Sequence, residues 1–111
     1  MRLSEIGGER VFDVIADITV PVLSIAMDDE ASALFKREKA PKGEDPTKFM
    51  MKRIQAALPT LIRGHREDLI SIFCALHGVG RDEYVEGLNM STLLKDLYEM
   101  MTDEQLLAFL S

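Results

Sequence analysis

The sequence is poor in the residues that build disulfide frameworks, metal sites and aromatic cores. Among its 111 residues there are one cysteine, two histidines, no tryptophan and seven phenylalanines and tyrosines. A lone cysteine excludes an internal disulfide, and there is no cysteine/histidine cluster of the kind that binds zinc. Cys74 lies in the largely apolar run 70–76, so we expect a buried structural thiol. Leucine, isoleucine, valine, alanine and seven methionines must therefore form the core.

Long hydrophobic runs are also missing. A membrane-spanning helix needs about 20 consecutive apolar residues, and no stretch of the sequence comes near this length. The N-terminal region lacks the basic segment followed by a continuous apolar stretch that is typical of a signal peptide. We therefore expect a cytoplasmic protein that has no membrane partner.

The composition is ordinary for a folded protein, with 47% apolar and 29% charged residues. A chain of this length predicts one domain, residues 1–111. The net charge of −6 is unevenly spread, because residues 41–66 carry six basic and two acidic groups whereas residues 67–111 carry two basic and nine acidic groups. The acidic balance argues against binding to a phosphate backbone, so we expect no nucleic-acid partner.

Helical periodicity runs through most of the chain. Residues 8–27 carry apolar side chains over most of the helix circumference, so this helix must be covered on several sides and is expected to be central. Pro21 should kink it or end it near Thr19 or Val20, and the pattern leaves open which of the two occurs.

The remaining helices are marked by caps and breakers. We expect a short helix from Asp28 or Asp29 to about Arg37 and a mobile polar loop near residues 38–45. Further helices are expected at 46–63 (capped by Asp45, bent by Pro59 and stopped by Gly64), at 66–77 (closed by Gly78), at 81–86 (ending at Gly87), after a Ser91 cap, and after a Thr102–Gln105 capping box. The fold class is thus all-α, a compact bundle of five to seven helices.

No catalytic, metal or cofactor site is recognisable. His65 and His77 are 12 residues apart on one predicted helix, roughly 18 Å along its axis, and cannot share a metal ion. His65 can pair locally with Asp68, and His77 suits a helix C-terminus. Gly7-Gly8 lacks the remaining residues of a phosphate loop, and no serine has an adjacent base. We therefore expect that the protein is not an enzyme.

The apolar side chains of the C-terminal helices form a candidate partner-binding group. Methionine is flexible and suits surfaces that accept varied partner helices, and acidic residues flank the group. Core packing is the competing interpretation for most of these side chains. The group consists of Leu94, Leu97, Tyr98, Met100, Met101, Leu106, Phe109 and Leu110.

Several segments together form a pattern that covers nearly the full length of the chain. They are Met1–Ile6, Glu9–Ile18 with Pro21, Leu34–Arg37, the polar loop, Ala75–Val79, Arg81–Tyr84, and a leucine-rich helix followed by the closing helix Thr102–Phe109. In these segments, which consist of packing and capping residues rather than a reactive signature, the sequence resembles the small tail assembly chaperones of long-tailed phages and prophages of Gram-positive bacteria.

The resemblance implies a concrete role. Proteins of this family bind the tape measure protein, a long helical apolar chain, and keep it soluble while the tail tube protein polymerises around it. They act in the host bacterial cytoplasm and are absent from the mature virion. The family implies no catalytic residues or cofactor. We therefore expect the tape measure protein, and also the tail tube protein, as partners, together with self-association into a homo-oligomer.

Two other functions fit some of the residues. Arg63-Gly64-His65-Arg66 between two predicted helices allows a small DNA-associated or regulatory phage protein, although no basic recognition helix accompanies it. A virion head-tail structural component is the second alternative, and presence in purified particles would favour it over a chaperone.

Overall fold

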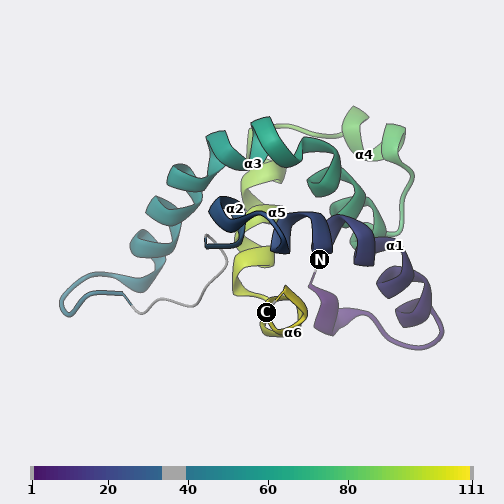
Figure 1. Ribbon diagram of the computed structural model, residues 1–111, viewed down its shortest axis with the longest axis horizontal. Helices are drawn as coiled ribbons and strands as arrows, with labels where there is room; N and C mark the ends of the chain where they lie inside the picture. Colours follow the sequence, from purple (N-terminus) through teal and green to yellow (C-terminus); the bar gives the residue numbers. More distant parts are fainter. Residues whose placement is uncertain (1, 34–39, 111) are drawn as a thin grey trace.

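The computed structural model describes residues 2–33 and 40–110, and these ranges contain six α-helices, one short 3-10 helix and no strand. This confirms the predicted all-α bundle of five to seven helices. Figure 1 shows the arrangement, in which one half of the longest helix projects from the rest. The elements are η1 (Leu3–Glu5), α1 (Arg10–Ala26), α2 (Asp29–Ala33), α3 (Pro46–His77), α4 (Arg81–Glu86), α5 (Met90–Thr102) and α6 (Glu104–Leu110).

Helix α1 packs most extensively against α3 and also touches α2 and α6. Its inward face is fully apolar, and the side chains there are at most 2% exposed. They meet the buried face of the second half of α3, where Phe73 is the largest fully buried side chain. The inward face of α1 consists of Val14, Ile18, Val22 and Ile25.

Pro21 lies inside α1 without ending it. The helix continues to Ala26, so of the two alternatives that the sequence left open, an end near Thr19 or Val20 does not occur. The proline has no N–H to donate to the carbonyl of Asp17, but Asp17 is exposed and water can reach that carbonyl. The ring of Pro21 itself is buried in the core. Burial of the apolar face therefore outweighs the loss of one hydrogen bond.

The connection between α1 and α3 is described in part. Asp28 caps α2, since its Oδ1 accepts the N–H groups of Glu30 at 3.0 Å and Ala31 at 3.2 Å. The predicted continuation to Arg37 and the first part of the predicted polar loop lie outside the described residues. Residues 40–45 contain a turn, in which Glu44 N–H donates to the carbonyl of Pro41. The mobility of this loop stays a prediction.

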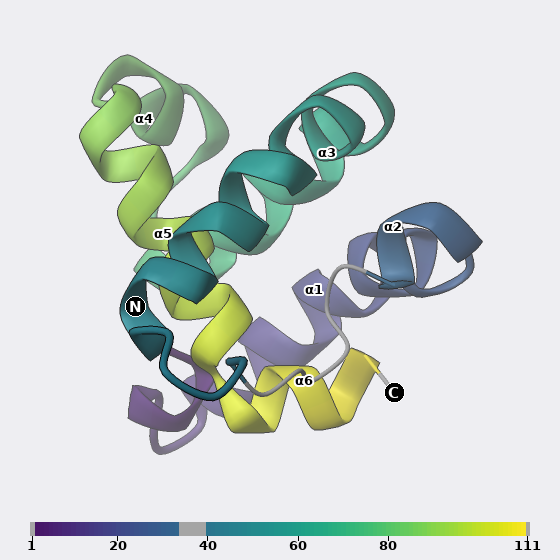
Figure 2. The ribbon, with the colours of Figure 1, turned by 90° about the vertical axis from the view of Figure 1, so that its left-hand side faces the viewer.

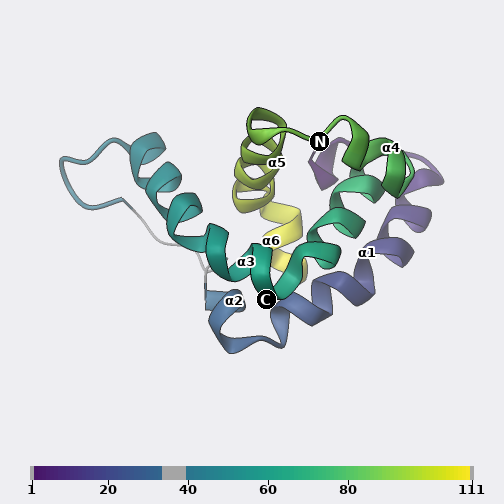
Figure 3. The same ribbon diagram turned by 90° about the horizontal axis from the view of Figure 1, so that it is seen from above.

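Helix α3 joins two segments that the sequence predicted as separate helices. It begins at Pro46, where Asp45 accepts the N–H of Thr47, and it ends at Gly78, whose φ is +72°. Both ends confirm the prediction. The expected stop at Gly64 is instead a kink at His65, which has non-helical backbone angles of φ −136° and ψ 27°. Figure 3 shows the two halves of α3 diverging at this kink.

The cap of α5 differs from the expected one. Asn89, rather than Ser91, accepts the N–H of Thr92 at 3.0 Å, and the Thr92 hydroxyl accepts the N–H of Asn89 at 2.9 Å. Asparagine is at least as good a cap as serine, and here its reciprocal bond with Thr92 satisfies two donors at once. The helix therefore begins two residues earlier than expected.

The corner between α5 and α6 also corrects a prediction. Thr102 is the last residue of α5, and its hydroxyl donates back to the carbonyl of Tyr98, so it does not form a capping box with Gln105. Asp103 caps α6 by accepting the N–H groups of Gln105 and Leu106. The other carboxylate oxygen of this buried residue accepts the backbone N–H of Leu3. Figure 2 shows α5 running into α6 at this corner.

Alanine should have opposite effects on stability at Gly64, within α3, and at Gly78, the C-cap of α3. A Cβ at Gly78 would lie 2.9 Å from Nη2 of Arg10 and would occupy a left-handed backbone conformation. A Cβ at Gly64 would meet no atom within 4 Å. We expect Gly78→Ala to lower the free energy of unfolding by about 1–2 kcal/mol and Gly64→Ala to raise it by about 0.5–1 kcal/mol. Urea denaturation of both variants checks this, and equal effects of the two would contradict the described end of α3.

Candidate functional site

The predicted partner-binding group is half buried in the structure. Four of its side chains lie in the core, Leu94 and Tyr98 are partly buried, Phe109 is exposed, and the side chain of Leu110 is outside the description. Substituting Leu97 or Met101 with a charged residue would therefore disrupt the core, so that such a variant could not test whether these side chains bind a partner. The four core members are Leu97, Met100, Met101 and Leu106.

Exposed apolar side chains gather instead on α1. Eight large hydrophobic side chains are exposed among the described residues, and five of them belong to this helix or to its C-cap, Met27. Their exposed fractions range from 37% to 80%, which together amounts to several hundred Å². The largest apolar patch on a typical monomer covers about 300–600 Å² and is often functional. The five residues are Phe12, Ile15, Val20, Leu23 and Met27.

Most of these side chains form one row, which we call the α1 stripe: Phe12, Ala16, Val20, Leu23 and Met27, all exposed. At about 100° per residue, the stripe occupies roughly 80° of the helix circumference on the side opposite Val14, Ile18 and Ile25. From residue 16 onward the spacing is four, three and four, which is the a/d spacing of a coiled-coil seam. The stripe is about 22 Å long at 1.5 Å per residue. In Figure 3 α1 lies along an outer edge of the molecule.

The sequence contained a signal for this stripe. Residues 8–27 are apolar around most of the helix circumference, which predicted cover on several sides. Within residues 2–33 and 40–110, that cover lies on one side, mainly through α3, and the opposite side is exposed. Periodicity could not show which apolar face α3 would take.

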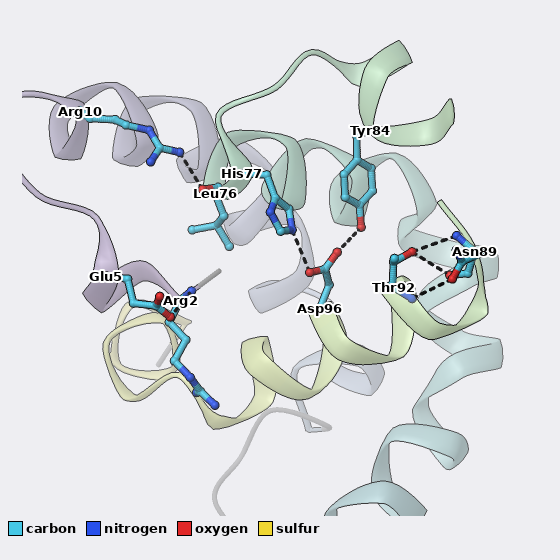
Figure 4. Close-up of polar contacts among 9 residues, drawn as sticks. All are labelled: Arg2, Glu5, Arg10, Leu76, His77, Tyr84, Asn89, Thr92 and Asp96. Atoms are coloured by element: carbon cyan, nitrogen blue, oxygen red, sulfur yellow. Dashed lines mark hydrogen bonds and ion pairs between the residues drawn. The ribbon is translucent and has the colours of Figure 1, made fainter. Parts of the chain in front are cut away.

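Acidic side chains flank the α1 stripe. Glu9, Asp13 and Asp17 follow one another at four-residue spacing on one side, all exposed, and none of them forms an ion pair within residues 2–33 and 40–110. The only basic residue of α1, Arg10, is engaged elsewhere. Its Nη2 donates to the last carbonyls of α3, at 3.2 Å from Ala75 O and 2.7 Å from Leu76 O. Figure 4 shows this side chain reaching to Leu76.

A second cluster joins α3, α4 and α5. Oδ1 of Asp96 lies 2.9 Å from Nε2 of His77, and Oδ2 of Asp96 accepts the hydroxyl of Tyr84 at 2.6 Å. Figure 4 shows both partners converging on this carboxylate. Burial raises the pKa of Tyr84, and the bond to Asp96 raises it further, so Tyr84 stays a neutral donor. The sequence indicated only a position at a helix terminus for His77 and did not reveal its contact with Asp96, 19 residues away.

A shallow pocket of about 370 Å³ lies beside this cluster, with Val79, Leu88, Thr92 and Lys95 among its other lining residues. The size is that of a small-molecule site. The buried carboxylate in its wall already has a partner at each oxygen, and no buried side-chain polar atom among the described residues lacks a hydrogen bond. The cluster therefore acts as a structural tie between the three helices.

A third cluster lies at the kink of α3. Nδ1 of the buried His65 is 2.8 Å from Asp68, as the sequence predicted, and Nε2 is 2.7 Å from Asp28, the cap of α2. Burial lowers the pKa of His65, but the bonds to Asp68 and Asp28 together outweigh it, and the pKa is raised above 6.5. The His65 bond is also the main cause that lowers the pKa of Asp28 below 3.8. The imidazole of His65 thus lies between two carboxylates, that of Asp68 on α3 and that of the α2 cap Asp28.

Other chemical features are sparse. Cys74 is buried, as predicted, and burial raises the pKa of its thiol. No group of three or more histidine, cysteine or acidic side chains in the described ranges is placed to hold a metal ion. No described helix combines the length and apolar character that a membrane crossing requires.

Comparisons of the chain with protein-family models, with curated proteins and with solved structures give no match. The functional inference therefore rests on the residues of this chain.

The buried carboxylate of Asp96 leads to a prediction about two tyrosines. Tyr84→Phe removes one of its two donors, and we expect the free energy of unfolding to fall by roughly 1.5–3 kcal/mol. Tyr98→Phe is the matched control, because the Tyr98 hydroxyl has no hydrogen bond among the described residues, and it should change stability by less than about 0.5 kcal/mol. Denaturant titration of both variants measures the difference, and similar losses would argue against the cluster.

The His65 bridge predicts a pH dependence. Because the folded pKa of His65 is raised, its stabilising contribution is complete below the unfolded value of 6.5 and is lost as pH rises through the folded pKa. Because the pKa of Asp28 is lowered, its contribution is present above 3.8 and is lost as pH falls. The destabilisation caused by His65→Gln should therefore be larger at pH 5 than at pH 8.5, as measured by urea denaturation. A destabilisation that is equal at both pH values, or larger at pH 8.5, would contradict the bridge.

Proposed function

We propose that this protein is a phage tail assembly chaperone that binds a helical, apolar client, the tape measure protein, and keeps it soluble during tail tube assembly. The main support for this proposal is the α1 stripe, a row of exposed apolar side chains on one face of a helix whose opposite face is buried in the core. A helix that is apolar on two faces gains stability from a second covering element.

The form of the surface favours a helical client. Amphipathic helices bind with apolar anchors at i, i+3, i+4 and i+7, and the stripe presents its side chains at matching intervals. Its length of about 22 Å corresponds to roughly 15 residues of a partner helix lying alongside. Met27 and Phe12, at the two ends, are the most exposed members, and both are large enough to fill gaps between partner side chains.

A binding role also agrees with how the polar clusters are used. His77, Asp96 and Tyr84 satisfy one another, and His65 is engaged by two carboxylates. These are the groups that a reaction would need, and in this fold they hold helices together. Among the described residues, most of the large apolar side chains that remain at the surface lie on α1 or at its C-cap.

The family resemblance of the sequence supports the choice of client, and the genome offers a direct check. A long open reading frame for a helix-rich, apolar protein directly downstream of this gene is expected. The product of that frame is the client to use in the experiment. Detection of the present chain as a stoichiometric component of purified virions would instead favour a structural role.

The α1 stripe predicts the result of a matched pair of substitutions. Met27 and Met90 are 80% and 78% exposed, but only Met27 belongs to the stripe. In co-expression with the tape measure protein, Leu23→Gln combined with Met27→Gln should transfer the client to the insoluble fraction. Each lost apolar contact is worth on the order of 2 kcal/mol, so binding should weaken more than about tenfold.

Met90→Gln is the control and should leave the client soluble. Circular dichroism should show unchanged helix content for all variants, because glutamine is a good helix former and these side chains are outside the core. Full client solubility with the double variant, or no solubilisation by the unchanged protein, would refute the proposal.

A further inference from the structure

The charges beside the α1 stripe narrow the choice of partner, and this inference rests on the proposed function. Glu9, Asp13 and Asp17 form an exposed acidic row along the first half of α1. No basic side chain of α1 offsets them, because the guanidinium of Arg10 is held at the end of α3. Beyond the other end of the helix, Asp29 and Glu30 are exposed as well.

We propose that the α1 stripe binds a basic amphipathic helix, one whose apolar seam is bordered by lysine or arginine. Such a helix, lying along α1, would place its bordering cations opposite Asp13 and Asp17 while its seam covers the stripe. In coiled-coil packing, the residues that border the apolar seam set partner choice and orientation in this way. The acidic row therefore acts as a selectivity element rather than as a source of affinity.

A second copy of this chain is the competing occupant, and charge argues against it. In a parallel pair, the acidic row on one flank of each α1 helix would face the opposite flank of its partner, which carries Ile15 and Thr19 and no cation. In an antiparallel pair, the acidic flanks of the two helices would lie on the same side of the contact. Neither arrangement offers the acidic row a cation, because the one basic residue of α1, Arg10, is held at the end of α3.

The size of the patch also argues against a second copy as the occupant. A stable dimer of standard size buries about 800 Å² on each partner. The α1 stripe exposes several hundred Å² on a convex helix surface. This area fits one partner helix better than the broad face of a second globular copy.

The test uses two synthetic peptides of about four turns that share the same leucine seam at a and d positions. One carries lysine and the other glutamate at the bordering e and g positions. Fluorescence anisotropy with the full-length protein should show the lysine peptide binding at least about tenfold more tightly at low salt. The difference should narrow at 0.5 M NaCl, because exposed charges are screened over a few Å at that ionic strength.

Charge reversal on the protein gives the decisive comparison. Asp13→Lys combined with Asp17→Lys should weaken binding of the lysine peptide on the order of tenfold and strengthen binding of the glutamate peptide. Glu86→Lys, an exposed reversal at the end of α4, is the control and should leave the ratio of the two affinities unchanged.

The outcomes separate this inference from the proposed function. The charge selectivity is overturned if both peptides bind equally well, or if the lysine peptide is still preferred by the Asp13→Lys/Asp17→Lys variant. This holds even if Leu23→Gln weakens the binding of both peptides, a result that would leave the proposed function standing. A dimer in sedimentation velocity that Leu23→Gln dissociates also overturns it, because the occupant is then a second copy. Failure of both peptides and of the tape measure protein to bind overturns the selectivity and the proposed function together.

Discussion

The packing of α1 against the second half of α3 is the interaction on which the rest of the structure depends. Ile18, Val22 and Ile25 are fully buried, and they belong to the same core cluster as Phe73 of α3. Arg10 adds a polar tie at one end of the contact by donating to the terminal carbonyls of α3. Once this pair is formed, α5 and α6 can close over it, and α2 can lie beside the kink. The same contact decides which face of α1 is turned outward.

Buried polar groups act in this bundle as ties between helices. Asp96 connects the end of α3 with α4 and α5, and His65 connects the middle of α3 with the start of α2. Each tie satisfies groups that burial would otherwise penalise, and each restricts how two helices meet. A small core without tryptophan depends on such ties for a unique arrangement. The histidines and the buried carboxylates are thus used for architecture, whereas the surface proposed to bind a client is apolar.

The sequence predicted the parts of the fold that depend on neighbouring residues. The start of α3 at Asp45-Pro46 and its end at Gly78 follow from local backbone preferences, and both were located correctly. The caps at Asn89 and Asp103 were missed because better or equal cap residues stood within two positions of Ser91 and Thr102, and tertiary packing decided between them. His65 pairs with Asp28, which lies 37 residues away, and a contact at this distance produces no periodic pattern in the sequence. For the candidate site, the apolar pattern of residues 8–27 indicated more apolar surface than one neighbouring helix can cover. The pattern could not show which face of the helix would remain exposed.

Asp103 joins the two ends of the described chain. It is the C-cap of α5, and its carboxylate caps the start of α6 and accepts the backbone N–H of Leu3, a residue 100 positions away in the sequence. Opening of η1 would remove a donor from this buried acid and would loosen the α5–α6 corner, and opening of the corner would release η1. The amides of both regions should therefore exchange with solvent deuterium as one cooperative unit, although they lie about 100 residues apart in the sequence.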